Sequence, residues 1–390
     1  MNIEKLKKDG TQQLVAVGLG SRLLNDTLVQ MFYAFLPILA RGLGIAPEQM
    51  GQLLSVRSAA GFLTPLFGNL AERKGYRTTL PILLFCGGSG SILFAFSPNL
   101  SFAAFAIFVM GLCVSVFQPL LAAYTSAALP PDQRARGMGI IEYGWALSSI
   151  VGVYAVGRVI EATNWRVPLI GLGIGLIVMA LVFARLLRNR PDADDTPPIS
   201  LLEQFNVTEN RTQAYAAVGM QAMITFSALH LFTAYSTWLF EVHQFETLSL
   251  GSIALGFGFV DIIGSGLVSL TLDRVGRKRA LAFGCGLSAV TFALLVWVDQ
   301  FGLAAALVAL FIGRFLFEWT IVAGVITVSE QAPNQRSRVM SLLGVFGTAA
   351  QSVAVVSGTL AYRQFGLAGL GFPTAIGFLV ACFLAWRFID

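Results

Sequence analysis

Long apolar runs separated by short polar connections make up most of this 390-residue chain. Each run is long enough to cross about 30 Å of hydrocarbon as a helix, which takes about 20 residues. The runs are continuously apolar, whereas the strands of a membrane β-barrel show short alternating segments. Twelve runs lie at about 13–40, 50–71, 78–97, 101–129, 137–160, 167–187, 213–240, 248–271, 279–298, 302–329, 338–361 and 367–387. The pattern therefore predicts an all-α polytopic membrane protein with twelve transmembrane helices.

The composition supports a place in a bilayer. Hydrophobic residues make up 56% of the chain and charged residues 12%, and the mean hydropathy is +0.73. This is too little polar material to cover a soluble globule of this size. The four cysteines fall inside apolar runs, without the paired spacing of metal or disulfide chemistry. We therefore expect no metal and no cofactor, and we interpret the charged N-terminus as leading into a retained first span.

The distribution of Lys and Arg predicts the orientation. If both termini are cytoplasmic, the inner segments carry nineteen of these residues and the outer loops carry four. Basic residues concentrate on the cytoplasmic side of membrane proteins, so we predict an integral multi-pass protein with both termini inside, in a bacterial inner membrane. The net charge of +5 is mostly this asymmetry, and no nucleic-acid partner is needed to explain it.

Two short motifs occur twice, about 200 positions apart. The charged turn "GNLAERKGYR" at 68–77 is repeated in "SLTLDRVGRK" at 269–278, and "LPPDQRARGM" at 129–138 is repeated in "QAPNQRSRVM" at 331–340. Two independent motifs with nearly the same offset indicate an internal duplication. The polar, Pro- and Asp-rich segment 188–212 separates the copies. We predict an N-terminal six-helix bundle at 1–187, a cytoplasmic linker at 188–212 and a C-terminal six-helix bundle at 213–390.

Twelve spans with a doubled charged turn resemble the major facilitator superfamily (MFS) over essentially the whole chain. The residues that carry the resemblance are Gly68, Leu70, Glu72, Arg73, Gly75 and Arg77, and Asp273, Arg274, Gly276, Arg277 and Lys278. The resemblance implies two pseudo-symmetric bundles that rock around a central cavity lined by spans 1, 4, 7 and 10. It also implies that the charged turns form a cytoplasmic gate. The stretch "NDTLVQMFYAFLP" in span 1 is similar to the first-span signature of drug-exporting members.

Several charged residues lie inside the predicted spans, where each needs a partner, water or a function, because an ionised side chain costs at least about 2.5 to 3.5 kcal/mol there. These are Arg22, Asp26, Arg57, Glu142, Asp261, Arg314 and Glu318. Arg22 with Asp26, and Arg314 with Glu318, are four residues apart and can approach within one helical turn. Each pair is either a structural ion pair or takes part in proton coupling or substrate binding.

The remaining embedded charges allow several interpretations. Asp261 has no base within four residues on its own helix, so its partner must be another helix, water or a proton. Glu142 lies near the cytoplasmic end of span 5, and we expect it to snorkel or to contact the loop of Arg134 and Arg136. Arg57 could attract an anionic substrate or pair with an acid across the cavity.

A histidine and several aromatic residues complete the candidate site. His230 is a candidate because a histidine side chain changes its charge near neutral pH. A histidine with satisfied hydrogen bonds is the simpler interpretation. Aromatic side chains on spans 1, 4, 7 and 10 could offer an apolar, cation-attracting surface to an organic substrate. These candidates are Phe32, Tyr33, Tyr124, Tyr235 and Trp319.

These patterns predict a secondary transporter that works by alternating access. Asp26, Asp261 and the first-span signature favour proton-coupled efflux (antiport) of small lipophilic compounds or metabolites. The embedded arginines favour the alternative, proton-coupled uptake of a small organic anion or a sugar. We find no nucleophile–base set and no phosphate loop, so an enzyme or a receptor is not favoured. The expected partners are a small-molecule substrate, protons and the lipid bilayer, and we expect a monomer.

Overall fold

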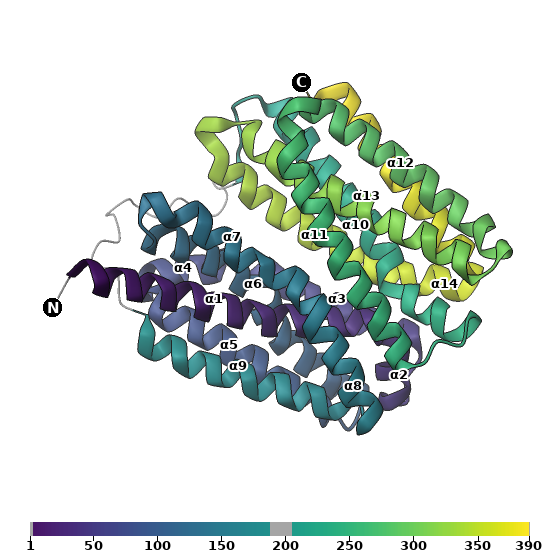
Figure 1. Cartoon of the computed structure of the whole chain (residues 1–390), viewed down its shortest axis with the longest axis horizontal. Coiled ribbons are helices and arrows are strands. Elements are labelled where there is room, and N and C mark those ends of the chain that lie inside the picture. Colours follow the sequence, from purple (N-terminus) through teal and green to yellow (C-terminus); the bar gives the residue numbers. More distant parts are fainter. Residues whose placement is uncertain (1–2, 188–204, 390) are drawn as a thin grey trace.

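The computed structural model describes residues 3–187 and 205–389, except for the side chains of residues 3–11, 72, 131, 132 and 135. The described chain is almost entirely helical (Figure 1). The helices of its first half are α1 (Ile3–Ala34), α2 (Leu36–Leu43), α3 (Pro47–Ala59), α4 (Thr64–Lys74), α5 (Tyr76–Ala95), α6 (Leu100–Ala128), α7 (Pro131–Leu147), α8 (Tyr154–Ala162) and α9 (Arg166–Leu186). Those of its second half are α10 (Arg211–Val242), α11 (Thr247–Val275), α12 (Arg277–Val298), α13 (Leu303–Glu330) and α14 (Arg336–Phe388).

The helices account for the twelve predicted spans. By length and composition, nine helices of the described chain can cross a membrane, or ten if α1 and α2, which meet at an angle of 79°, form one span. The long α14 contains two predicted spans, because Gly366 breaks its helical geometry with φ 57°. The span predicted at 50–71 consists of α3, a 3-10 turn at Ala60–Leu63 and α4, so each piece is short. The fold class is confirmed, and only the continuity of some helices differs.

The helices form two bundles, one from each half of the chain, which lie side by side in Figure 1. We call the end of the molecule that holds residues 187 and 205 the linker end, and the opposite end, with the turns at 44–46 and 243–246, the far end. The halves contact each other mainly through α3 on α14 and through α8 on α11. The bundles diverge toward the linker end in Figure 1. The segment 188–204, in which we predicted most of the linker, lies outside the described residues.

Close packing between the halves at the far end depends on glycines. A Cβ atom at Gly51 on α3 would overlap the side chain of Thr359 and lie 2.9 Å from the Val355 carbonyl oxygen, both on α14. A Cβ at Gly251 on α11 would lie 3.8 Å from the Cα atoms of Gly157 and Tyr154 on α8 of the first half. Small residues let helices approach this closely in membranes. The structure is therefore a state in which the halves are joined at the far end.

The two charged turns have the same backbone conformation. Gly75 follows α4 with φ 82° and ψ 150°, and Gly276 follows α11 with φ 83° and ψ 138°. Positive φ is accessible to glycine at little cost, which explains why both copies of the motif place glycine at this position. The shared geometry supports the duplication that the sequence predicts.

Candidate functional site

The first half contains a buried cluster of three charged residues. Arg22 Nε lies 2.5 Å from Asp26 Oδ2 within α1, and its Nη2 lies 3.3 Å from Glu142 Oε2 on α7. Arg22 and Asp26 are almost fully buried, whereas about half of the Glu142 side chain is exposed. The predicted contact of Arg22 with Asp26 is thus present. The cluster holds two carboxylates and one guanidinium, so it has one more acidic group than basic group.

Glu142 meets the expectation only in part. We predicted that it would snorkel or contact the Arg134 and Arg136 loop. Its side chain is about half exposed, and its ion pair in the described chain is with Arg22 across the interface of α1 and α7. The close approach of these helices explains the difference, because Gly144 packs directly on the Arg22 side chain. A narrow cleft that includes Arg22, Thr125 and Glu142 reaches this cluster.

The second half contains a related cluster, in which the arginine pairs with a carboxylate on another helix rather than on its own. Arg314 on α13 binds Asp261 on α11 with both ends of its guanidinium, at 2.7 Å from Nε to Oδ1 and 2.5 Å from Nη2 to Oδ2. The prediction that another helix could supply the partner of Asp261 is confirmed. The i, i+4 pair of Arg314 with Glu318 is not among the ion pairs of the described chain, although the two charges lie close enough to interact. The bidentate geometry of Arg314 is satisfied across the helices instead.

The surroundings of Arg314 are aromatic. Its guanidinium carbon lies 5.1 to 5.3 Å from the ring centres of Phe232, Phe257 and Phe317, distances at which a cation is attracted to a ring. Tyr235 packs against Phe232 and Phe257. The charged pair therefore lies in an apolar aromatic setting.

Two further contacts extend the second cluster. Glu318 accepts a hydrogen bond of 2.5 Å from Ser265 Oγ. Trp145 Nε1, from the first half, donates to Asp261 Oδ2 at 3.3 Å. This last contact joins α7 of the first half to Asp261 on α11 of the second half. A change at Asp261 therefore alters a direct contact between the halves.

A polar group that the sequence analysis missed lies between these clusters. Gln30 on α1 donates to Ser148 Oγ at 2.7 Å and to the Trp145 carbonyl oxygen at 3.0 Å, and it accepts from Ser149 Oγ. Ser148 and Ser149 begin a π-helical turn, Ser148–Val153, between α7 and α8. Such turns often occur at functional sites. The serine pair inside an apolar run was the available sequence signal.

Arg57 is fully buried near the interface of the halves. Its guanidinium donates to Tyr33 Oη at 3.0 Å and to the Val29 carbonyl oxygen at 3.4 Å, and it lies 5.2 Å from the ring centres of Phe32 and Tyr33. Within residues 3–187 and 205–389 no ion pair involves Arg57, so the acid that we considered as its partner is not found there. Gln351 of the second half donates to the same Tyr33 hydroxyl at 3.2 Å.

Other candidates have packing roles in this structure. The two ring nitrogens of His230 lie 2.9 Å from Ser357 Oγ and from the Gly369 carbonyl oxygen, which agrees with the interpretation of a satisfied histidine. Trp319 Nε1 donates to the Ala280 carbonyl oxygen of α12, so its polar edge contacts a neighbouring helix rather than a central cavity. Tyr124 pairs with Tyr76 of α5, and Phe32 packs against Phe94 as well as Arg57.

The charged turns lie at the linker end, where their described contacts stay within one half. Arg77 Nε lies 3.3 Å from the Ala184 carbonyl oxygen, and Arg277 forms an ion pair with Glu330. Asp273 and Arg274 are exposed, and the described ion pairs do not include them. The remaining gate candidates are Gly68, Arg73, Gly75, Gly276 and Lys278, and the side chain of Glu72 lies outside the described part. A latch that is broken in this state agrees with these contacts.

Asp273→Asn is expected to favour this far-end-closed state by up to about fivefold, the range of an exposed charge contact. The reason is that the gate acid would stabilise only the opposite state, in which the linker end is closed. Alkylation of a cysteine introduced at Arg274 should become faster, and Asp273→Glu should behave like the unchanged protein. A large loss of substrate affinity in a cross-linked, fixed conformation would contradict a gating role.

Comparisons with known proteins agree with this geometry. The sequence model described as Major Facilitator Superfamily matches residues 19–249, and the one described as Sugar (and other) transporter matches residues 190–389. An uncharacterised MFS-type transporter of Bacillus subtilis, YhcA, is 28% identical over 46% of this chain, and the niacin transporter NiaP of Acinetobacter baylyi is 25% identical over 46%. These alignments span only 34% and 40% of the two relatives.

Matches of greater extent also exist. A Haemophilus influenzae protein named "probable sugar efflux transporter" is 23% identical over 89% of this chain and 86% of its own length. The solved structure of a bacterial homologue of the human lysosomal transporter Spinster, in an inward-facing and occupied conformation, superposes with a TM-score of 0.76 at 13% identity over 97% of each chain. At that identity the likeness shows the fold alone. The matched family models and the doubled bundle together place this chain in the Major Facilitator Superfamily.

Proposed function

We propose that the protein is a secondary transporter that exports a small lipophilic compound in exchange for protons. The observation that carries the proposal is the pair of buried acidic clusters, one in each half, in which an arginine and a proton can compete for the same carboxylate. In the first cluster this carboxylate is Asp26, held by Arg22. In the second it is Asp261, held by Arg314.

The exchange step follows from the charge count of each cluster. Two carboxylates share one arginine in Arg22, Asp26 and Glu142, and two lie near one arginine in Asp261, Arg314 and Glu318. A proton on one carboxylate leaves a neutral cluster, which is the less costly state inside a membrane. A substrate that takes the place of the proton must then bring a positive charge, so a lipophilic cation fits this exchange. The aromatic rings around Arg314 and the half-exposed Glu142 fit such an exchange.

The predicted orientation of the protein in the membrane indicates the direction of the proposed transport. With the termini inside, as the Lys and Arg distribution predicts, the linker end faces the cytoplasm, and the structure is the state that would load a compound from inside. The cleft at Arg22 and Glu142 then provides the proton path on that side. The relative named "probable sugar efflux transporter" supports export. We take only the direction of transport from its name, and not the sugar as the substrate.

Arg57 favours a second candidate, proton-coupled uptake of a small organic anion. It is a fully buried cation, and among the described residues its contacts are neutral or aromatic. A buried charge is normally paired, so an anionic substrate could complete the site. The niacin relative makes nicotinate the first probe for this candidate.

Asp26→Asn is expected to abolish accumulation against a gradient while leaving downhill exchange of substrate largely intact. The amide keeps the size of the side chain, but it cannot take up a proton when its contact with Arg22 is broken. The assay uses purified protein in liposomes with an imposed pH gradient and a panel of lipophilic cations, neutral drugs and nicotinate. Gradient-driven accumulation should fall at least about tenfold, in the range by which buried charge pairs matter.

The same assay separates the candidates. Thr27→Ser, one position along α1, is a matched control because its hydroxyl can keep the bond to the Leu23 carbonyl oxygen. Coupled transport that survives Asp26→Asn would refute the role of Asp26. Accumulation of nicotinate alone, lost in Arg57→Gln, would favour the second candidate over export.

A further inference from the structure

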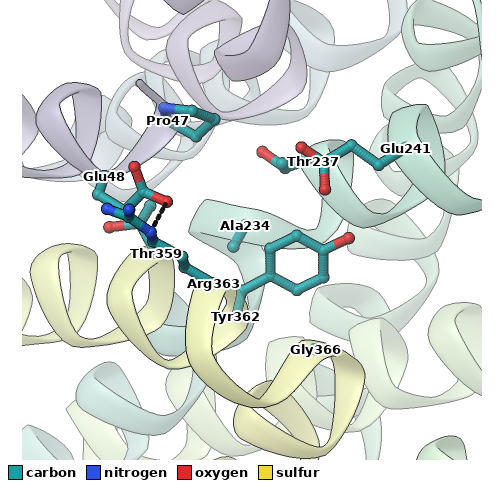
Figure 2. Close-up of a pocket in the computed structure, with 9 residues that line it drawn as sticks. All are labelled: Pro47, Glu48, Ala234, Thr237, Glu241, Thr359, Tyr362, Arg363 and Gly366. Atoms are coloured by element: carbon teal, nitrogen blue, oxygen red, sulfur yellow. Dashed lines mark ion pairs between the residues drawn. The ribbon is translucent and has the colours of Figure 1, made fainter. Parts of the chain in front are cut away.

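A cavity of about 330 Å³ lies at the far end, away from both acidic clusters. Figure 2 shows that it lies between helices of both halves. Its lining residues are Pro47 and Glu48 on α3, Ala234, Thr237 and Glu241 on α10, and Thr359, Tyr362, Arg363 and Gly366 on α14. Because α3 belongs to the first half and the other helices to the second, the cavity exists only when the halves meet at this end.

The charge that faces the cavity is negative. Glu48 Oε1 lies 3.5 Å from Arg363 Nε, but two thirds of the Arg363 side chain is exposed to solvent, whereas Glu48 is 9% exposed. Glu241, an exposed residue, adds a second carboxylate that lines the same cavity as Tyr362. Two carboxylates thus face one arginine. Glu241 and Arg363 are both exposed and screened by water, so the buried Glu48 is the least screened charge at the cavity.

Two buried polar atoms at this cavity are unsatisfied. Thr237 is 1% exposed and its Oγ1 has no hydrogen-bond partner in the described chain, and the same is true of Glu48 Oε2. In Figure 2 the Thr237 side chain lies beside Glu241 and faces Glu48 and Pro47 across the cavity. Buried polar atoms are nearly always satisfied, so a bound molecule that offers a hydroxyl group and a positive charge would complete both.

We propose that this cavity binds a small hydroxylated organic cation and that the bound cation holds the far end closed. The face of the Tyr362 ring can contact the ammonium group of the ligand, and Glu48 and Glu241 balance the charge of that group. Thr237 forms a hydrogen bond with the hydroxyl group of the ligand. The site goes beyond the proposed transport function, because it lies outside the two acidic clusters and forms in only one state of the cycle. A cation bound there slows exchange between the two states.

Choline and its neutral isostere 3,3-dimethylbutan-1-ol test the site on the purified full chain in detergent. Choline at millimolar concentration should raise the thermal midpoint in a saturable manner, because a ligand that binds only the folded state stabilises it. The isostere should give no saturable shift. Glu241→Gln and Thr237→Val should each weaken choline binding, the first by about tenfold, while Glu246→Gln, an exposed acid outside the cavity, should leave it unchanged.

The outcomes are decisive in both directions. Any of three results would overturn the proposal. The first two are equal shifts with choline and the isostere, and unchanged choline binding in Glu241→Gln. The third is no shift at a choline concentration about a hundred times the millimolar dissociation constant that is expected for a single weak site. The midpoint of each variant without ligand shows that it folds. Binding is measured without transport, so failure here leaves the proton-exchange proposal standing, and failure of proton exchange leaves this site standing.

Discussion

Replacing Asp261 by Asn is expected to abolish transport and to lower the free energy of unfolding by about 3 to 5 kcal/mol, the usual cost of breaking a buried ion pair. The change removes the carboxylate that binds Arg314 at 2.5 and 2.7 Å. It leaves the buried guanidinium among three aromatic rings, with Glu318 near it but outside the described ion pairs. It also weakens the contact from Trp145, which links the halves. Stability is measured by denaturation in detergent and transport in liposomes.

A double variant separates stability from function. Asp261→Asn with Arg314→Gln removes both charges of the pair, while Glu318 keeps its hydrogen bond from Ser265. A neutral pair of similar volume should recover part of the lost stability. Transport should stay absent, because the carboxylate is gone. Glu161→Gln, which removes an exposed ion pair with Arg158 at 3.7 Å, is the matched control and should change stability by at most about 1 kcal/mol. A double variant that transports normally would show that the pair is purely structural.

Gly51→Leu is expected to reduce transport by about tenfold or more by wedging the halves apart at the far end. No side chain fits at Gly51 without displacing Thr359 or the α14 backbone, and overpacking of this kind costs about 1 to 3 kcal/mol. The cost falls only on the far-end-closed state, so the balance shifts toward the opposite state. Spin labels at the exposed positions Ala162 and Gln244, one in each half, should report a longer distance.

Gly171→Leu is the matched control for this wedge. Gly171 lies on α9, and a Cβ atom there has no neighbour within 4 Å. It should leave the label distance and the transport rate nearly unchanged. An unchanged label distance in Gly51→Leu would contradict the view that α3 and α14 form the closure between the halves.

The fold could be predicted from the sequence because the membrane leaves few alternatives. Continuous apolar runs must be helices, since the backbone has to satisfy its own hydrogen bonds in hydrocarbon. The charged turns at Gly75 and Gly276 marked the duplication, and their backbone geometry agrees. The break at Gly366 falls between the spans predicted at 338–361 and 367–387. What the runs did not show was the break inside the span predicted at 50–71, where a 3-10 turn at 60–63 changes the helix without changing its hydropathy.

The partners within the site were harder to predict. Spacing along one helix identified Arg22 with Asp26, but it also suggested Arg314 with Glu318, and there the better partner of Arg314 was Asp261 on another helix. The rotation of one helix against another is set by packing, which a single sequence does not show. The same reason explains Trp319, whose indole contacts α12, and Gln30, whose uncharged side chain gave little signal in an apolar run.

The sign of the proton flux in substrate-driven vesicles tests the central claim most directly. Liposomes with the reconstituted protein and an internal pH-sensitive dye receive a transported compound from outside, with the membrane potential clamped and protein-free vesicles as the blank. Exchange against protons predicts that the vesicle interior becomes alkaline as the compound enters, and that Asp26→Asn abolishes this change. An interior that becomes acidic, as in proton-coupled uptake, or one that shows no change while the compound enters, would contradict the account.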